Sequence, residues 1–202
     1  GVNSLTALFI GTKSKEDERE TVHTSFILCI ILGILMMIAC ELSANSTLRL
    51  LNTKEELIDG ASLYLRIYYL GLPAVSVFNF GNGVYSAAGN TKKPLTYLTV
   101  AGITNVLLNL FSVIVLNLGV AGVAIASVFA QYVSATLVVV SLFSSKEHYG
   151  LYPEHLKFTP SKAARILSLG VPAGLQNAIF QFANLFLQAG VNSFDAVTVE
   201  GN

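Results

Sequence analysis

The sequence predicts an all-α bundle of membrane-spanning helices, and three observations support that fold class. Only 12% of the 202 residues are charged and 53% are hydrophobic, whereas a soluble domain carries about 25% charged residues. Stretches without Asp, Glu, Lys or Arg run for 52, 25 and 29 residues, at 94–145, 67–91 and 166–194. Mostly apolar runs of this length are typical of transmembrane helices. No segment alternates as the strands of a membrane barrel do.

The spans follow one another along the whole chain. The first residues resemble the end of an apolar helix that finishes near Gly11, and Lys13–Glu20 is predicted to be a charged loop. The 52-residue uncharged run is too long for one helix and fits two that meet at Asn117-Leu118-Gly119. Each complete span is then long enough to cross ~30 Å of hydrocarbon. Five complete spans are expected, at 22–42, 62–88, 95–116, 120–143 and 164–191.

Polar or helix-breaking residues separate these spans. Asn45–Gly60 is predicted to be a polar connection, and Ser144–Lys162 is the longest loop. Gly89–Pro94 is expected to form a tight turn, because Gly and Asn tolerate positive φ and Pro cannot continue a helix. Pro73 should bend the span that contains it.

The basic residues of the connections predict the orientation. Nine fall on one side and three on the other, and positive charge marks the cytoplasmic face. Ser144–Lys162 is therefore expected to be cytoplasmic. The nine are Lys13, Lys15, Arg19, Lys92, Lys93, Lys146, Lys157, Lys162 and Arg165, and the three are Arg49, Lys54 and Arg66.

Neutral polar side chains form narrow edges on four spans. In the last span Asn177, Gln181, Asn184, Gln188 and Asn192 step by 4, 3, 4 and 4 residues, so they share an arc of about 80° on a helix. Three other spans carry similar edges, formed by Ser76, Asn79, Asn82 and Ser86, by Gly102, Asn105, Asn109 and Ser112, and by Ser127, Gln131, Ser134 and Ser141.

These edges must face inward, because an amide exposed to hydrocarbon leaves its donors and acceptors unpaired. They either form hydrogen bonds between helices, worth ~0.6 kcal/mol each, or line a water-filled cavity. Five amides in register on one helix exceed what packing requires, so we favour a cavity there. For the other three edges both interpretations stay open.

The remaining polar residues predict no reaction centre. No complete span carries a charge near its middle. Glu41 and His23 are expected at the two membrane interfaces, and Arg66 and Lys54 should extend to the outer headgroups. Phosphate-binding, metal-binding and nucleophile motifs are missing from the sequence, so we expect no metal site, no catalytic residue and no nucleic-acid partner.

Cys29 and Cys40 lie eleven residues apart in one span and are expected to be small apolar fillers.

Four segments together resemble the multidrug and toxic compound extrusion (MATE) family. Their order and spacing agree with the fourth to seventh helices of that family along nearly the whole chain. The segments are Tyr64–Ile67 with Gly71–Pro73, Ala88–Leu95, Leu118–Ser127 with Gln131, and Leu169–Gln176.

The resemblance implies part of a twelve-helix, two-lobe transporter, from the end of helix two to helix seven. Residues 1–143 would form most of the first six-helix lobe, 144–162 the cytoplasmic loop between lobes, and 163–202 the first helix of the second lobe. The family exports organic cations, drugs or metabolites across the cell membrane by alternating access, driven by H⁺ or Na⁺. The implied partners are a small organic substrate, the bilayer and the remaining helices of the same protein, with no cofactor.

The resemblance also implies roles for particular residues. Pro73 and Pro172 would be bend points between states. The cavity would be lined by Asn79, Asn105, Asn109, Gln131, Asn177, Gln181, Asn184 and Gln188.

The chain departs from the family at three positions. Many members carry a carboxylate where this chain has Phe180, an Asp or Asn where it has Val113, and an Arg where it has Ser86. The coupling carboxylate is therefore expected on helices outside this chain. The alternatives are a flippase for lipids or lipid-linked sugars with the same architecture, an integral-membrane enzyme, or a scaffold subunit that transports nothing.

Overall fold

The computed structural model describes residues 15–50 and 54–192, and the partial helix predicted before Gly11 lies outside them. Four helices are long and apolar enough to cross a membrane, and the bent pair α3–α4 meets the same test only when its two helices are taken together. The all-α membrane fold is therefore confirmed, and the predicted five spans are present if that pair counts as one. The elements are α2 (Lys15–Leu50), α3 (Glu55–Tyr69), α4 (Leu72–Ala87), α5 (Lys92–Leu110), the π-helix η1 (Phe111–Val115), α6 (Gly119–Ser144), the 3-10 turn η2 (Pro153–His155) and α7 (Pro160–Asn192).

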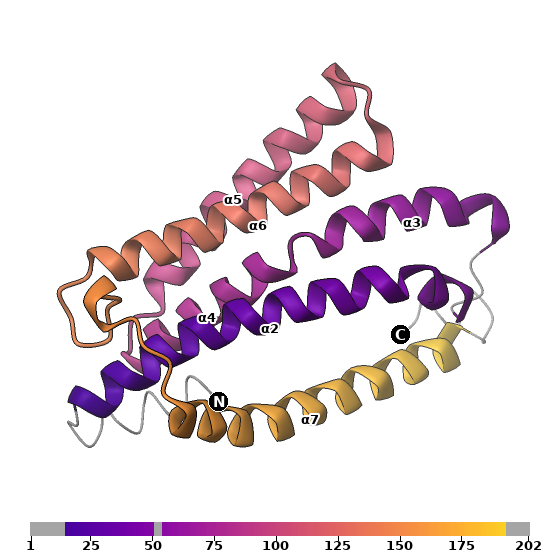
Figure 1. The fold of residues 1–202 in the computed structure, drawn as a ribbon. Coiled ribbons are helices and arrows are strands. Elements are labelled where there is room, and N and C mark those ends of the chain that lie inside the picture. Colours follow the sequence, from indigo (N-terminus) through magenta and orange to yellow (C-terminus); the bar gives the residue numbers. More distant parts are fainter. Residues whose placement is uncertain (1–14, 51–53, 193–202) are drawn as a thin grey trace.

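The helices lie side by side, with α3 and α4 between α2 and α6 (Figure 1). α5 packs on α6, and α7 packs mainly on the opposite side of the bundle, against α2. The main core lies at one end, where side chains of α2, α4 and α6 meet a loop residue; it consists of Val22, Phe80, Val84, Tyr85, Val138, Leu142 and Leu151.

The first complete helix is longer than predicted at both ends. α2 begins at Lys15, so the prediction of a loop through Glu20 is wrong for residues 15–20. It continues to Leu50, and α3 begins at Glu55, so most of the predicted connection 45–60 is helical as well. Acidic residues in the first turn of α2 and Arg49 in its last turn complement the helix dipole. The drop in hydropathy along the sequence therefore marks where the helix leaves the hydrocarbon layer of the membrane. It does not mark where the helix ends.

The third predicted span is two helices rather than one. α3 ends at Tyr69 and α4 begins at Leu72, with a bend of 43° between them. The bend lies just before Pro73, which is the second residue of α4, because a proline is tolerated in the first turn of a helix but not in its interior. The proline therefore restarts the helix after the break.

The turn predicted to divide the long uncharged run is confirmed. Asn117 and Gly119 have φ angles of 50° and 57°, a left-handed conformation in which no helix continues. Before the turn, α5 widens into the π-helix η1. α5 also begins earlier than the predicted residue 95, at Lys92, because Pro94 fits in its first turn.

The prediction that the basic loops share one side is confirmed, and that this side is cytoplasmic stays a prediction. The first turns of α2, the α4–α5 turn, the loop after α6 and the start of α7 all lie at one end of the bundle (Figure 1). There Lys162 pairs with Asp17 at 2.8 Å, and Lys93 lies over the ring of Tyr85. Leu151 of the loop is fully buried in the core. This end carries most of the basic residues.

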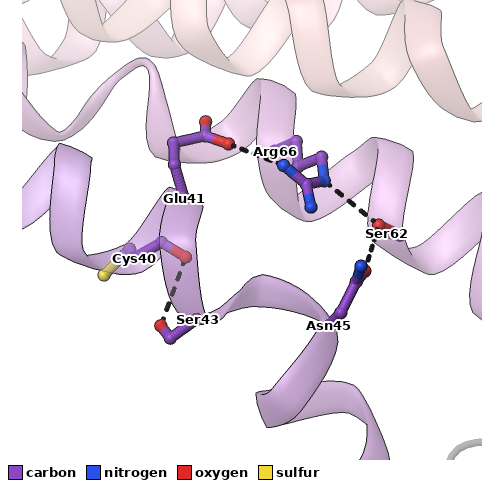
Figure 2. A network of polar contacts seen from close by, with 6 residues as sticks. All are labelled: Cys40, Glu41, Ser43, Asn45, Ser62 and Arg66. Carbon is purple, nitrogen blue, oxygen red and sulfur yellow. Dashed lines mark hydrogen bonds and ion pairs between the residues drawn. The ribbon is translucent and has the colours of Figure 1, made fainter.

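At the other end, Arg66 is paired with α2. Its Nη1 lies 3.6 Å from Glu41 Oε2, and its Nε donates to Ser62 Oγ at 3.4 Å (Figure 2). Ser62 in turn donates to Asn45 Oδ1. That Arg66 extends to the outer headgroups stays a prediction, to which the structure adds a carboxylate beside it. The pair is half exposed and contributes roughly 0–1 kcal/mol.

Candidate functional site

A polar hollow lies between α3, α5 and α6, on the side of the bundle away from α7. Its volume is about 350 Å³. Two of the predicted polar edges line it together, because α5 and α6 pack side by side along their length. The lining residues are Tyr68, Leu98, Ala101, Gly102, Asn105, Ser127, Ala130, Gln131 and Ser134.

Two carboxamides at or beside this hollow, Gln131 in its lining and Asn109 one turn from Asn105, have unused acceptors. Asn109 Nδ2 donates to Asn105 Oδ1 at 3.1 Å, one turn away on α5. Asn109 Oδ1 and Gln131 Oε1 are both buried, and within the described residues neither has a hydrogen-bond partner. A buried carbonyl oxygen without a donor costs about 1–3 kcal/mol. Such oxygens would be stabilised by a ligand that donates hydrogen bonds or carries positive charge.

The break between α3 and α4 makes room for one of these amides. A Cβ on Gly71 would lie 1.9 Å from Gln131 Oε1, so a larger residue there would displace the end of this side chain. The next residue on α6, Tyr132, donates its hydroxyl to the carbonyl oxygen of Leu70 at 2.8 Å. A broken helix in a membrane exposes backbone groups that must find partners. α6 therefore both supports the break and presents an amide beside it.

The predicted site residues fall into three groups in the structure. Asn105 and Gln131 line the polar hollow together, and Asn109 lies one turn from Asn105 on α5, bonded to it but not part of the lining. Asn79 is exposed on α4 and does not line the hollow. Asn177, Gln181, Asn184 and Gln188 are exposed on α7, which lies on the far side of α2. The side chain of Asn192 lies outside the described residues.

Some of the predicted polar edge on α4 connects helices. Ser76 donates its hydroxyl to the carbonyl oxygen of Cys29 on α2 at 2.7 Å. On α6, Ser141 is hydrogen bonded to the Tyr85 hydroxyl of α4. At these two positions the interpretation as hydrogen bonds between helices is correct. The edges are thus mixed: Ser76 and Ser141 join helices, whereas Asn105 and Gln131 line the polar hollow.

Reasoning from sequence missed Tyr68, which lines the polar hollow, and Tyr132, whose hydroxyl binds the Leu70 carbonyl oxygen at the helix break. Both carry a hydroxyl within an apolar span, where a tyrosine hydroxyl usually finds a hydrogen-bond partner. Tyr132 is also adjacent to Gln131 in sequence. The two hydroxyls are visible in the sequence, but the sequence pattern did not predict the helix break at Leu70 that Tyr132 supports.

The two proline candidates differ in their surroundings. Pro73 follows the α3–α4 break and lies next to Gly33 of α2, whereas Pro172 lies inside α7 without interrupting that helix. A proline inside a helix removes one backbone hydrogen bond and weakens the helix there. A role for either residue in motion stays a prediction.

A second polar cluster attaches the long loop to α2. His23, predicted at the membrane interface, is fully buried. Its Nδ1 lies 2.8 Å from the carbonyl oxygen of Arg19, and its Nε2 accepts the Tyr152 N–H at 2.9 Å. A carbonyl can only accept, so Nδ1 carries the proton and the ring is neutral. Thr24 adds a further contact by accepting the Thr159 N–H at 3.0 Å.

Replacing His23 with alanine is expected to lower the free energy of unfolding by about 1–3 kcal/mol, because the buried Tyr152 N–H loses its acceptor. Thermal unfolding and protease cleavage within residues 145–159 would measure the effect. His148→Ala is the matched control, since His148 is an exposed histidine of the same loop. Equal behaviour of the two variants would contradict the role of His23.

These features define a class of protein: a multipass α-helical membrane protein with a polar hollow between its spans. The MatE family model matches residues 1–111, and the chain belongs to the MatE family. Members of this family are transporters rather than enzymes.

Two curated relatives and one solved structure agree with that assignment. The chain is 32% identical over 156 residues to the probable multidrug resistance protein YpnP of Bacillus subtilis, covering 76% of this chain and 34% of the relative. It is 26% identical to the probable multidrug resistance protein NorM of Thermotoga maritima, covering 96% of this chain and 44% of the relative. A crystal structure of MATE in the bent conformation has the same fold, with a TM-score of 0.88, 23% identity, and coverage of 98% and 45%. The chain thus spans less than half the length of these relatives.

Proposed function

We propose that this chain supplies five spans of a secondary active transporter that exports organic cations or related drugs and metabolites across the cell membrane. Export would use antiport with H⁺ or Na⁺. The observation that carries the proposal is the polar hollow lined by Asn105 and Gln131, where the buried Gln131 Oε1 has no hydrogen-bond partner among the described residues. The membership in a family of transporters supports it.

The chemistry of the polar hollow suits a cation that must be released again. Carboxamide oxygens attract an ammonium group or a metal ion by their dipoles, and away from bulk water such interactions are strengthened. Because no lining residue carries a fixed charge, binding would be weaker than in an ion pair. Moderate affinity and varied hydrogen-bonding partners are what an exporter of diverse compounds requires.

The position of α7 supports a second part of the proposal. α7 packs mainly on α2 and leaves its polar edge exposed within this chain. In a two-lobe transporter, α7 would begin the second lobe, and its amides would face the central cavity. Alternating access would then change which side of the membrane the two sets of amides face.

Replacing Asn105 with leucine in the whole transporter is expected to reduce export of a fluorescent organic cation such as ethidium by roughly 10-fold or more, because a hydrogen bond to a charged group contributes about 1.5–3 kcal/mol. The loss also removes the partner of Asn109. Efflux from loaded cells, normalised to membrane expression, would measure it.

Thr104→Val is the control for this experiment. Thr104 neighbours Asn105 on α5, but its hydroxyl only bonds the carbonyl oxygen of Val100 within the helix. Export should remain near the wild-type rate in this variant. If Asn105→Leu exports as fast as Thr104→Val, the polar hollow does not bind the substrate.

A further inference from the structure

A second hollow, distinct from the polar hollow between spans, lies at the end of the bundle that carries the basic loops. Its volume is about 540 Å³. The first turns of α2 form one wall, and the last part of the loop before α7 forms the other. It is lined by Lys15, Glu16, Arg19, Glu20, His155, Lys157 and Thr159.

The charges of this basal hollow are not neutralised in pairs. Lys15, Arg19 and Lys157 are permanent cations, and Glu16 and Glu20 are the carboxylates of the lining. Among the residues that the structure describes, no ion pair joins these cations to these carboxylates. With neutral His155 the lining holds one excess positive charge, which matches a ligand with a single negative charge.

Arg19 is held in position to donate to such a ligand. Its guanidinium lies 5.7 Å from the centroid of the Tyr152 ring, and its Nη1 lies 3.3 Å from His155 Nε2. Its Nε is buried and has no hydrogen-bond partner within residues 15–50 and 54–192. Because Nε is enclosed, a ligand in the hollow would meet the Nη donors of this planar guanidinium, which suit a phosphate or carboxylate oxygen.

The basal hollow borders the first residues of two apolar spans. On α2 it ends at Glu20, directly before the buried Val22 and the apolar part of the span. On the other side Thr159 precedes α7, which begins at Pro160 and also crosses the membrane. The basal hollow therefore lies where two spans from different parts of the fold enter the bilayer. Basic pockets between spans on the cytoplasmic side are typical binding sites for lipid headgroups.

We infer that Lys15, Arg19 and Lys157 bind a singly charged phosphoryl group, presented by an anionic phospholipid of the cytoplasmic leaflet. The cations hold the phosphate oxygens, and Glu16 and Glu20 can accept hydrogen bonds from headgroup hydroxyls. The bound lipid joins the start of α2 to the segment that leads into α7. This site is separate from substrate export and does not depend on it.

Native mass spectrometry of the purified whole transporter with added phosphatidylglycerol would test the site. Lys15→Gln combined with Lys157→Gln is expected to weaken retention of phosphatidylglycerol by about 10-fold or more. Both side chains are exposed, so the substitutions should not disturb folding. Lys92→Gln combined with Lys146→Gln is the matched control, because it removes the same charge from exposed positions at the same end outside the hollow.

The source of the phosphoryl group is determined by competition. If glycerol 3-phosphate at millimolar concentration leaves the lipid bound, the site is a lipid site, as proposed. If glycerol 3-phosphate displaces the lipid from the wild type and itself binds the double variant more weakly, the phosphoryl site stands but its assignment to a lipid is overturned. The inference is overturned if both double variants retain phosphatidylglycerol equally.

Discussion

Replacing Gly33 with alanine is expected to destabilise the bundle by about 1–3 kcal/mol, and replacing it with leucine by more. A Cβ at this position of α2 would lie 2.8 Å from the Cα of Pro73 and 3.0 Å from the Cβ of Ser76. The first of these atoms belongs to the backbone, which cannot move without separating α2 from α4. Separation would also stretch the hydrogen bond from Ser76 to the Cys29 carbonyl.

Thermal unfolding of the purified protein would measure this effect. Gly60→Ala is the matched control, because Gly60 lies inside α3 with no atom within 4 Å of an added Cβ. Alanine there should leave stability unchanged or raise it by ~0.5–1 kcal/mol, since glycine is unfavourable inside a helix. A melting temperature of Gly33→Ala equal to that of wild type would show that the α2–α4 crossing is not tightly packed.

Replacing Asn184 or Gln181 with leucine should strongly reduce drug export by the whole transporter while expression stays normal. Both side chains are exposed along the polar edge of α7. If that edge lines a water-filled cavity, leucine removes a group that can form hydrogen bonds with the substrate. It also places an apolar side chain in contact with water. Folding should be preserved because neither residue is buried within this chain.

The controls separate binding from helix packing. Phe186 lies on the opposite side of α7 from the polar edge and is 77% exposed, so Phe186→Leu should export normally. Asn184→Gln keeps the carboxamide and should retain part of the activity. Export by Asn184→Leu at the wild-type rate would mean that these amides connect helices rather than bind a substrate.

The spans were predictable because their cause is local. A backbone in lipid must satisfy its own hydrogen bonds, so a long uncharged run of residues has little choice but a helix. The turn at Asn117 and Gly119 and the common end of the basic loops followed from residues close in sequence. Helix ends were less predictable, since hydropathy reports the membrane boundary and α2 continues beyond it at both ends.

The polar hollow was predictable only in part. The spacing of Asn105, Asn109 and Gln131 indicated that each lies on a polar edge of its helix, and the structure shows that these edges meet. The same reasoning could not separate Ser76 and Ser141, which connect helices, from the amides. That difference depends on which helix lies opposite each residue.

By itself, then, the sequence determined the class of fold, the number of spans and the side on which the basic loops lie. Only the tertiary structure decided where α3 and α4 separate, which amides face one hollow, how Arg66 is paired, and how His23 holds the loop. These features depend on the rotation and crossing of helices. Crossings are set by contacts between residues distant in sequence, such as Gly33 with Pro73 and Gln131 with Gly71, and no local pattern specifies them.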